Sequence, residues 1–75
     1  MKRELLNGVT IKSIRKTENW KHHTLYNIYS NGWLAMNCMN ITEVCQWLEW
    51  RFYLPEIKAI TPMKRFNRII KLIEG

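Results

Sequence analysis

The sequence predicts a small α+β domain, in which a three-stranded antiparallel sheet (a β-meander) is followed by two C-terminal helices that pack on it. Three observations predict this fold class. Residues that favour strands dominate the first half of the chain, and an Asn-Gly pair at 31–32 marks a hairpin turn. After residue 40, two segments combine helix-capping signals with apolar residues at helical spacing. At 75 residues the chain is expected to form a single domain, residues 1–75.

The first predicted strand covers residues 8–16, because Val9 and Ile11 alternate there with polar residues. Ile14 falls out of this alternation. A bulge near Ser13 would explain the change of phase, since one extra residue moves the following side chains to the other face. We therefore expect an irregular first strand.

A polar loop is predicted over residues 16–23, followed by strands over residues 23–30 and 33–39. Between these strands, Asn31-Gly32 predicts a type I′ turn, because both central residues of that turn need positive φ. A two-residue turn fixes the register, with Ser30 opposite Trp33, Ile28 opposite Ala35 and Tyr26 opposite Asn37. Both faces of the sheet then carry apolar side chains, so either helices cover both faces or one face is a contact surface.

The first helix is expected to begin after Asn40 and to end near Tyr53, before Pro55. Asn40 as N-cap and Glu43 three residues later form a capping box. Helical spacing defines two apolar stripes. The first is expected to face the core and contains Ile41, Val44, Cys45, Leu48 and Phe52, and the second contains Trp47, Trp50 and Leu54.

Residues 55–60 fit either a short helical turn or a short strand. Thr61-Pro62 then predicts an N-cap followed by a proline in the first helical position, and the last helix is expected from Met63 to about Glu74. Its apolar face contains Met63, Phe66, Ile69, Ile70 and Ile73. The opposite face, expected to meet water, carries Lys64, Arg65, Arg68 and Lys71.

The charge of the chain favours an anionic partner. Its net charge is +6, from 12 Lys and Arg against 6 acidic residues, all of them Glu. Residues 1–24 carry six basic residues and two Glu, residues 25–54 one basic residue and two Glu, and residues 55–75 five basic residues and two Glu. Two basic ends therefore flank a nearly uncharged aromatic middle, which suits nucleic acid or an acidic protein surface. The alternative is a basic protein whose charge serves solubility only.

The first functional hypothesis is a small non-enzymatic nucleic-acid-binding accessory or regulatory protein. Its candidate contacts with phosphates or another anionic partner are Lys12, Arg15, Lys16, Lys21, Lys58, Lys64, Arg65, Arg68 and Lys71. Aromatic contacts are expected from Trp20, Tyr29 and Trp50, whereas Trp33 and Trp47 are expected in the core. The chain is rich in Ile, Asn and Lys and poor in Ala, which suggests an AT-rich genome and a phage or mobile-element origin.

The second hypothesis is a protein–protein interaction module that acts as an inhibitor or modulator of a host or phage factor. Its anchors would be the hairpin and the stripe of Trp47, Trp50 and Leu54, because Trp is enriched where interfaces are buried. A homodimer through the same stripe is a variant of this hypothesis.

An enzyme is not expected, and neither is a cofactor. The chain has no Asp, no Gly-rich loop and only two Ser, at positions 13 and 30. A metal site is not expected either, because His22-His23 with Cys38 and Cys45 match no zinc spacing. No segment is long and apolar enough for a signal peptide or a membrane span, so we expect a cytoplasmic protein that does not act on membranes.

Overall fold

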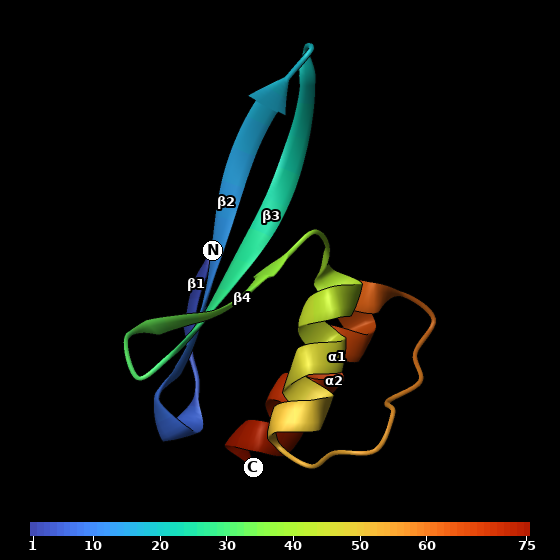
Figure 1. Cartoon of the computed structure of the whole chain (residues 1–75). Coiled ribbons are helices and arrows are strands. Elements are labelled where there is room, and N and C mark those ends of the chain that lie inside the picture. The colour runs from blue at the N-terminus through green and yellow to red at the C-terminus, as the bar shows by residue number, and fades with distance from the viewer.

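The computed structural model describes all 75 residues, and it shows an antiparallel sheet followed by two helices (Figure 1). In chain order the elements are β1 (Lys2–Glu4), a short 3-10 turn (Leu6–Gly8), β2 (Val9–Glu18), β3 (Lys21–Ser30), β4 (Trp33–Cys38), α1 (Ile41–Arg51) and α2 (Pro62–Glu74). The α+β prediction is confirmed. The sheet, however, has four strands in the order β1-β2-β3-β4, not three.

The additional strand, β1, is held at the edge of the sheet by backbone hydrogen bonds. Arg3 lies opposite Ile11, and the N–H of Ser13 donates to the carbonyl oxygen of Met1 over 2.8 Å. All three β1 residues are exposed and none is apolar. The sequence therefore has no hydrophobic pattern that would reveal this strand.

Strands β2 and β3 form one long hairpin of ten residues each, paired without interruption from Val9–Ser30 to Glu18–Lys21. The bulge predicted near Ser13 is wrong, because Ile14 is simply paired with Leu25 on the opposite face from Val9. The polar loop predicted over residues 16–23 is also wrong. Those residues complete both strands and the two-residue turn between them.

The turn between β3 and β4 has the predicted type I′ form, with φ of 51° at Asn31 and 85° at Gly32. Ser30 lies opposite Trp33 as predicted, but a register shift follows between Ile28 and Tyr29. Ile28 therefore pairs with Met36 and Tyr26 with Cys38, not with Ala35 and Asn37. This irregularity brings Met36 and Cys38 to the same side of the sheet as Ile28, so that the core can use them.

Both helices begin at the predicted caps. The side-chain oxygen of Asn40 accepts from the N–H of Glu43 over 3.0 Å, and that of Thr61 accepts from the N–H of Lys64 over 3.2 Å. Helix α1 ends at Arg51, two residues before the predicted end, because Tyr53 adopts a left-handed conformation with φ of 54°. Residues 55–60 form neither helix nor strand.

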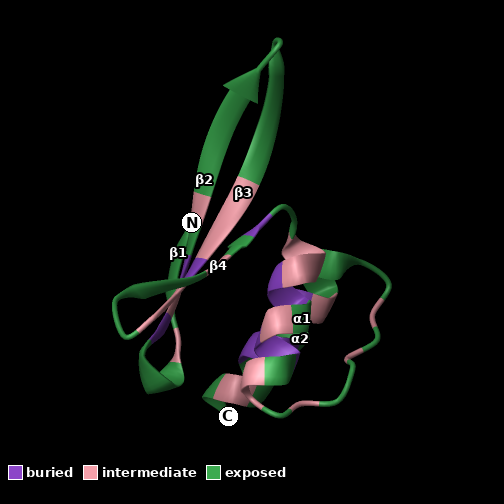
Figure 2. Ribbon diagram, in the orientation of Figure 1, coloured by how far each residue is buried: buried purple, intermediate pink, exposed green.

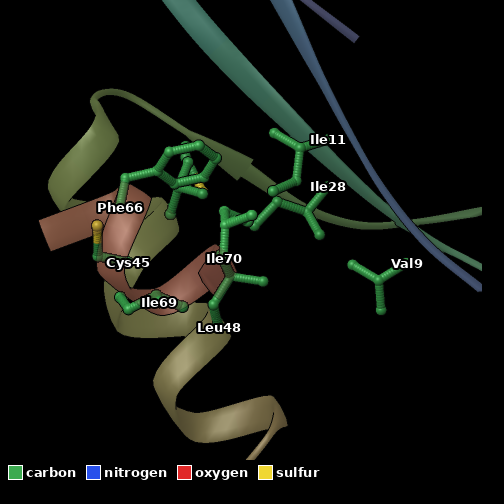
Figure 3. Close-up of a cluster of buried hydrophobic side chains, with 10 residues drawn as sticks. Val9, Ile11, Ile28, Cys45, Leu48, Phe66, Ile69 and Ile70 are labelled. Carbon is green, nitrogen blue, oxygen red and sulfur yellow. The ribbon is translucent and has the colours of Figure 1, made fainter. Parts of the chain in front are cut away.

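The core lies between one face of the sheet and the two helices, which cover the same face (Figures 1 and 3). Its ten buried residues are Val9, Ile11, Ile28, Cys38, Val44, Cys45, Leu48, Phe66, Ile69 and Ile70. The central residues of the predicted core stripe of α1 (Val44, Cys45 and Leu48) and of the predicted apolar face of α2 (Phe66, Ile69 and Ile70) are therefore buried as predicted. No helix covers the opposite sheet face, so the predicted arrangement with helices on both faces is wrong.

Candidate functional site

The long hairpin extends well beyond the rest of the sheet (Figure 1). Strand β1 pairs only with Thr10–Lys12 of β2, and β4 pairs only with Tyr26–Ser30 of β3. Beyond these partners, residues 14–24 form a two-stranded ribbon in which every residue is exposed (Figure 2). We refer to residues 14–24 as the arm. Because an isolated two-stranded hairpin gains little stability by itself, the arm contributes little to holding the fold together.

The tip of the arm is a two-residue turn at Asn19 and Trp20, whose φ angles of 49° and 64° correspond to a type I′ turn. The Trp20 side chain is 97% exposed, as the sequence predicted. The turn itself escaped prediction because Asn followed by Trp lacks the Gly that normally marks this turn type.

Strand alternation distributes the cations of the arm over both faces of the ribbon. Lys12, Lys16 and Lys21 lie on the face that the helices leave open, since Lys16 pairs with His23 and Glu18 with Lys21. Arg15, one residue out of phase, lies on the opposite face. Lys12 also stands over the ring of half-buried Tyr29, with its Nζ 5.1 Å from the ring centroid, at the base of the arm.

Two of the four cations that were predicted to face water on the last helix, Arg65 and Arg68, bind other parts of the protein. The prediction that Arg65 is free to bind a partner is wrong, because its guanidinium pairs with Glu49 of α1 and its side chain is only 15% exposed. Arg68 donates to the carbonyl oxygen of Lys58 over 2.6 Å, which ties α2 to the preceding loop. Lys64 and Lys71 remain exposed with no ion pair. The predicted row is therefore partly structural.

Glu49 is the residue that sequence reasoning missed. Its carboxylate accepts from Arg65 Nε over 3.1 Å, from Arg65 Nη2 and from the N–H of Ile57 over 2.7 Å. Burial alone would raise the pKa of this carboxyl, but the hydrogen bonds from Arg65 and Ile57 outweigh burial and lower the pKa below its usual value. The sequence did not predict this pair, because Glu49 lies one position from the core stripe of α1 and its partner Arg65 lies sixteen residues later on another helix.

The two basic regions lie on different sides of the molecule. Helix α2 packs on the covered sheet face (Figure 1), while the strand register places Lys16 and Lys21 on the open face and only Arg15 on the covered side. The sequence left open whether the two patches share a side. In the structure they do not, so the arm and the α2 surface are separate candidate sites.

Two further aromatic side chains are exposed at the end of α1. Trp50 is 71% exposed and lies 6.1 Å from half-buried Trp47, measured between ring centroids. Tyr53 is 94% exposed in its left-handed position. Trp47 packs against the core as expected, whereas the expectation that Trp33 is buried is wrong, because Trp33 directly follows the Asn31-Gly32 turn and faces water.

The cysteines and histidines do not come together. Cys38 and Cys45 are buried in the core, while His22 and His23 lie on the arm. Burial raises the pKa of Cys45 to about 11 and also raises that of Cys38, so neither thiol is a ready nucleophile. No three potential metal ligands among His, Cys and Glu converge anywhere in the chain. Neither helix is long and apolar enough to cross a membrane.

Comparisons of this chain with protein families, with curated proteins and with solved structures found no match.

Proposed function

We propose that this protein is a small, non-enzymatic nucleic-acid-binding accessory or regulatory protein, and that the arm is its contact element. The observation that carries the proposal is the arm itself. It holds eleven consecutive exposed residues, with three cations (Arg15, Lys16 and Lys21) against one acid (Glu18) and an exposed Trp at its tip.

A two-stranded β-ribbon is one of the elements that proteins place in a groove of DNA. Cations along such a ribbon displace counterions from phosphates, which gives affinity without the need for a concave pocket. Packing in the core does not explain the composition of the arm, because none of its residues is buried. Lys12 at its base extends the basic surface onto the open sheet face.

The proposal predicts steep salt dependence. If three or four cations meet phosphates, log K should fall with log salt at a slope of about −2.7 to −3.6, so that affinity drops about 40- to 150-fold between 50 and 200 mM salt. Fluorescence anisotropy with a labelled duplex measures this slope. The test variant is Arg15→Gln/Lys16→Gln/Lys21→Gln.

A matched control is Lys58→Gln/Lys64→Gln/Lys71→Gln, which removes the same charge from the α2 side. The arm variant should lose most of its affinity and flatten the slope by about 2.7 units, while the control changes both only slightly. Equal losses in the two variants would show that net charge matters and the arm does not. Binding that is absent or insensitive to salt would overturn the proposal.

A protein–protein interaction module remains the second candidate, and one observation favours it. Trp50 and Tyr53 are both exposed at the end of α1, and Tyr53 occupies a left-handed position that normally takes Gly. Exposed aromatic anchors of this kind dominate binding at protein interfaces. Two measurements on protein purified without nuclease discriminate the candidates: the ultraviolet absorbance ratio, which detects bound nucleic acid, and the mass from light scattering, which detects a dimer. Nucleic acid that co-purifies and dissociates in high salt favours the arm, and a salt-resistant dimer that Trp50→Ala disrupts favours the aromatic surface.

A further inference from the structure

The turn at the tip of the arm combines two features that the fold does not explain. Trp20 is the most exposed large apolar side chain of the protein, and it takes part in no aromatic pair and no cation–π contact. It also occupies the second central position of a type I′ turn, where its φ of 64° is unfavourable for a bulky residue.

The second hairpin of the same sheet shows the usual solution. There the equivalent position is Gly32, with φ of 85° and no neighbouring atom that would restrict it. The arm keeps a Trp where the backbone favours Gly, and it keeps that Trp in water. Strain of this kind is typical of positions that contact a ligand.

The cations near the tip are arranged on both faces of the ribbon. Lys16 and Lys21 lie on one face, and Arg15 lies on the other. A ribbon that rests flat on a single strand would need cations on one face only. Cations on both faces suit a ribbon that stands between two phosphate backbones, as it would in a groove of a duplex.

The number of aromatic residues points the same way. Proteins that bind single strands stack successive bases on several aromatic side chains. The arm has one aromatic residue, at its leading end, and the nearest tyrosines, Tyr26 and Tyr29, lie below the arm and are half-buried. One apolar side chain at the leading end of the ribbon resembles the wedges that minor-groove binders insert between neighbouring base pairs.

We propose that the ligand is a nucleic-acid duplex and that Trp20 inserts between two of its base pairs while the arm lies in the groove. This inference rests on the proposed function and adds the class of nucleic acid and the residue that contacts the bases. The phosphate contacts supply the salt dependence, and Trp20 supplies affinity that does not depend on salt.

The test uses Trp20→Gly, Trp20→Ala and, as a control, Ile60→Ala, which removes an exposed apolar side chain outside the arm and outside both candidate sites. Trp20→Gly creates the preferred Asn-Gly pair, so the arm should stay folded. Affinity for a duplex should fall about 5- to 150-fold in both Trp20 variants, with the salt slope unchanged, because stacking is lost and the cations remain. Ile60→Ala should bind like the natural protein.

Two additional readouts separate a ligand contact from a structural role. A duplex with 2-aminopurine at the site of insertion should change its fluorescence with the natural protein but not with Trp20→Gly, because insertion replaces the stacking between bases by stacking on the indole ring. Amide hydrogen exchange in the arm should be slower in Trp20→Gly, by about 5-fold, because the strain at the turn is relieved. Binding and local stability are thus expected to change in opposite directions.

The outcomes are distinct from those of the proposed function. Salt-dependent binding that Trp20→Gly leaves at full strength would overturn the wedge and leave the nucleic-acid proposal intact. Tighter binding to a single strand than to the duplex of the same sequence, at the same salt, would overturn the duplex assignment. Salt-independent binding would overturn both proposals.

Discussion

Removal of Glu49 tests the interaction that joins the two helices and the loop between them. The carboxylate lies on α1 and accepts hydrogen bonds from Arg65 of α2 and from Ile57 of the loop. The side chains of Glu49 and Arg65 are only 9% and 15% exposed. Glu49→Ala would leave a guanidinium and a backbone N–H without partners in this sheltered position.

Loss of one partner of a buried ion pair costs about 3–5 kcal/mol. A chain of this size is expected to have a free energy of unfolding of about 4–11 kcal/mol. Glu49→Ala should therefore remove a large part of the stability. With an m-value of about 1 kcal/mol/M, the urea midpoint should fall by about 3–5 M, as followed by circular dichroism.

Glu74→Ala is the matched control, because it breaks the Arg3–Glu74 ion pair, whose side chains are 44% and 43% exposed. That variant should cost no more than about 1 kcal/mol. If Glu49→Ala is unfolded from the start, Glu49→Leu/Arg65→Met still tests the reasoning, because replacing both partners by apolar residues should restore a folded protein. A cost for Glu49→Ala as small as that for Glu74→Ala would refute the argument.

The same pair sets a pH dependence. The pKa of Glu49 is lowered in the folded protein, because hydrogen bonds to the carboxylate outweigh the effect of burial. Its stabilisation is therefore complete above the pKa of the unfolded chain, about 4.3, and is lost as pH falls through the lower folded pKa. The natural protein should lose stability below about pH 4 more steeply than Glu49→Gln, as measured by urea unfolding across this range.

Two further predictions concern the turn and the core. Gly8→Ala should lower the free energy of unfolding by about 1–3 kcal/mol in thermal or urea unfolding, because its φ is +74°, a strained conformation for alanine, and the added Cβ would also displace the side chain of Asn31. Gly32→Ala, which has positive φ but no close neighbour, should cost less, and equal costs would contradict this account. Cys45, whose burial raises the pKa to about 11, should react with a thiol reagent at pH 8 about 100-fold more slowly than in the unfolded chain, and Cys38 should also be slowed. Rates that match those of the unfolded chain would show that these thiols are not sheltered.

Local signals in the sequence were sufficient for the helices and for one turn. The side chains of Asn40 and Thr61 each accept a hydrogen bond from an N–H group in the first turn of their helix, and Pro62 has no N–H group that would need a partner. The helix starts therefore depend on a few neighbouring residues. Asn31-Gly32 accepts positive φ with little strain, which makes its turn equally local. The apolar spacing of α2 similarly predicted Phe66, Ile69 and Ile70 in the core.

Features without a local signal were missed or wrongly predicted. The arm escaped because a ribbon exposed on both faces has no apolar alternation, and its turn has Trp20 where Gly is usual. The availability of the cations on α2 was overestimated, since Arg65 finds its partner sixteen residues away on another helix. The candidate site therefore lies on the arm and not on the cations of α2. Its residues Arg15, Lys16, Lys21 and Trp20 were already among the predicted contacts.

By itself, the sequence determined the α+β class, the helix starts, the Asn31-Gly32 hairpin and the excess of positive charge, because each depends on composition or on residues a few positions apart. Only the tertiary structure decided which cations are free, which sheet face is open and how far the hairpin extends beyond its neighbours. Those properties depend on contacts between distant segments. Whether an Arg faces water or a carboxylate is set by how two helices pack, and no spacing within either helix encodes it.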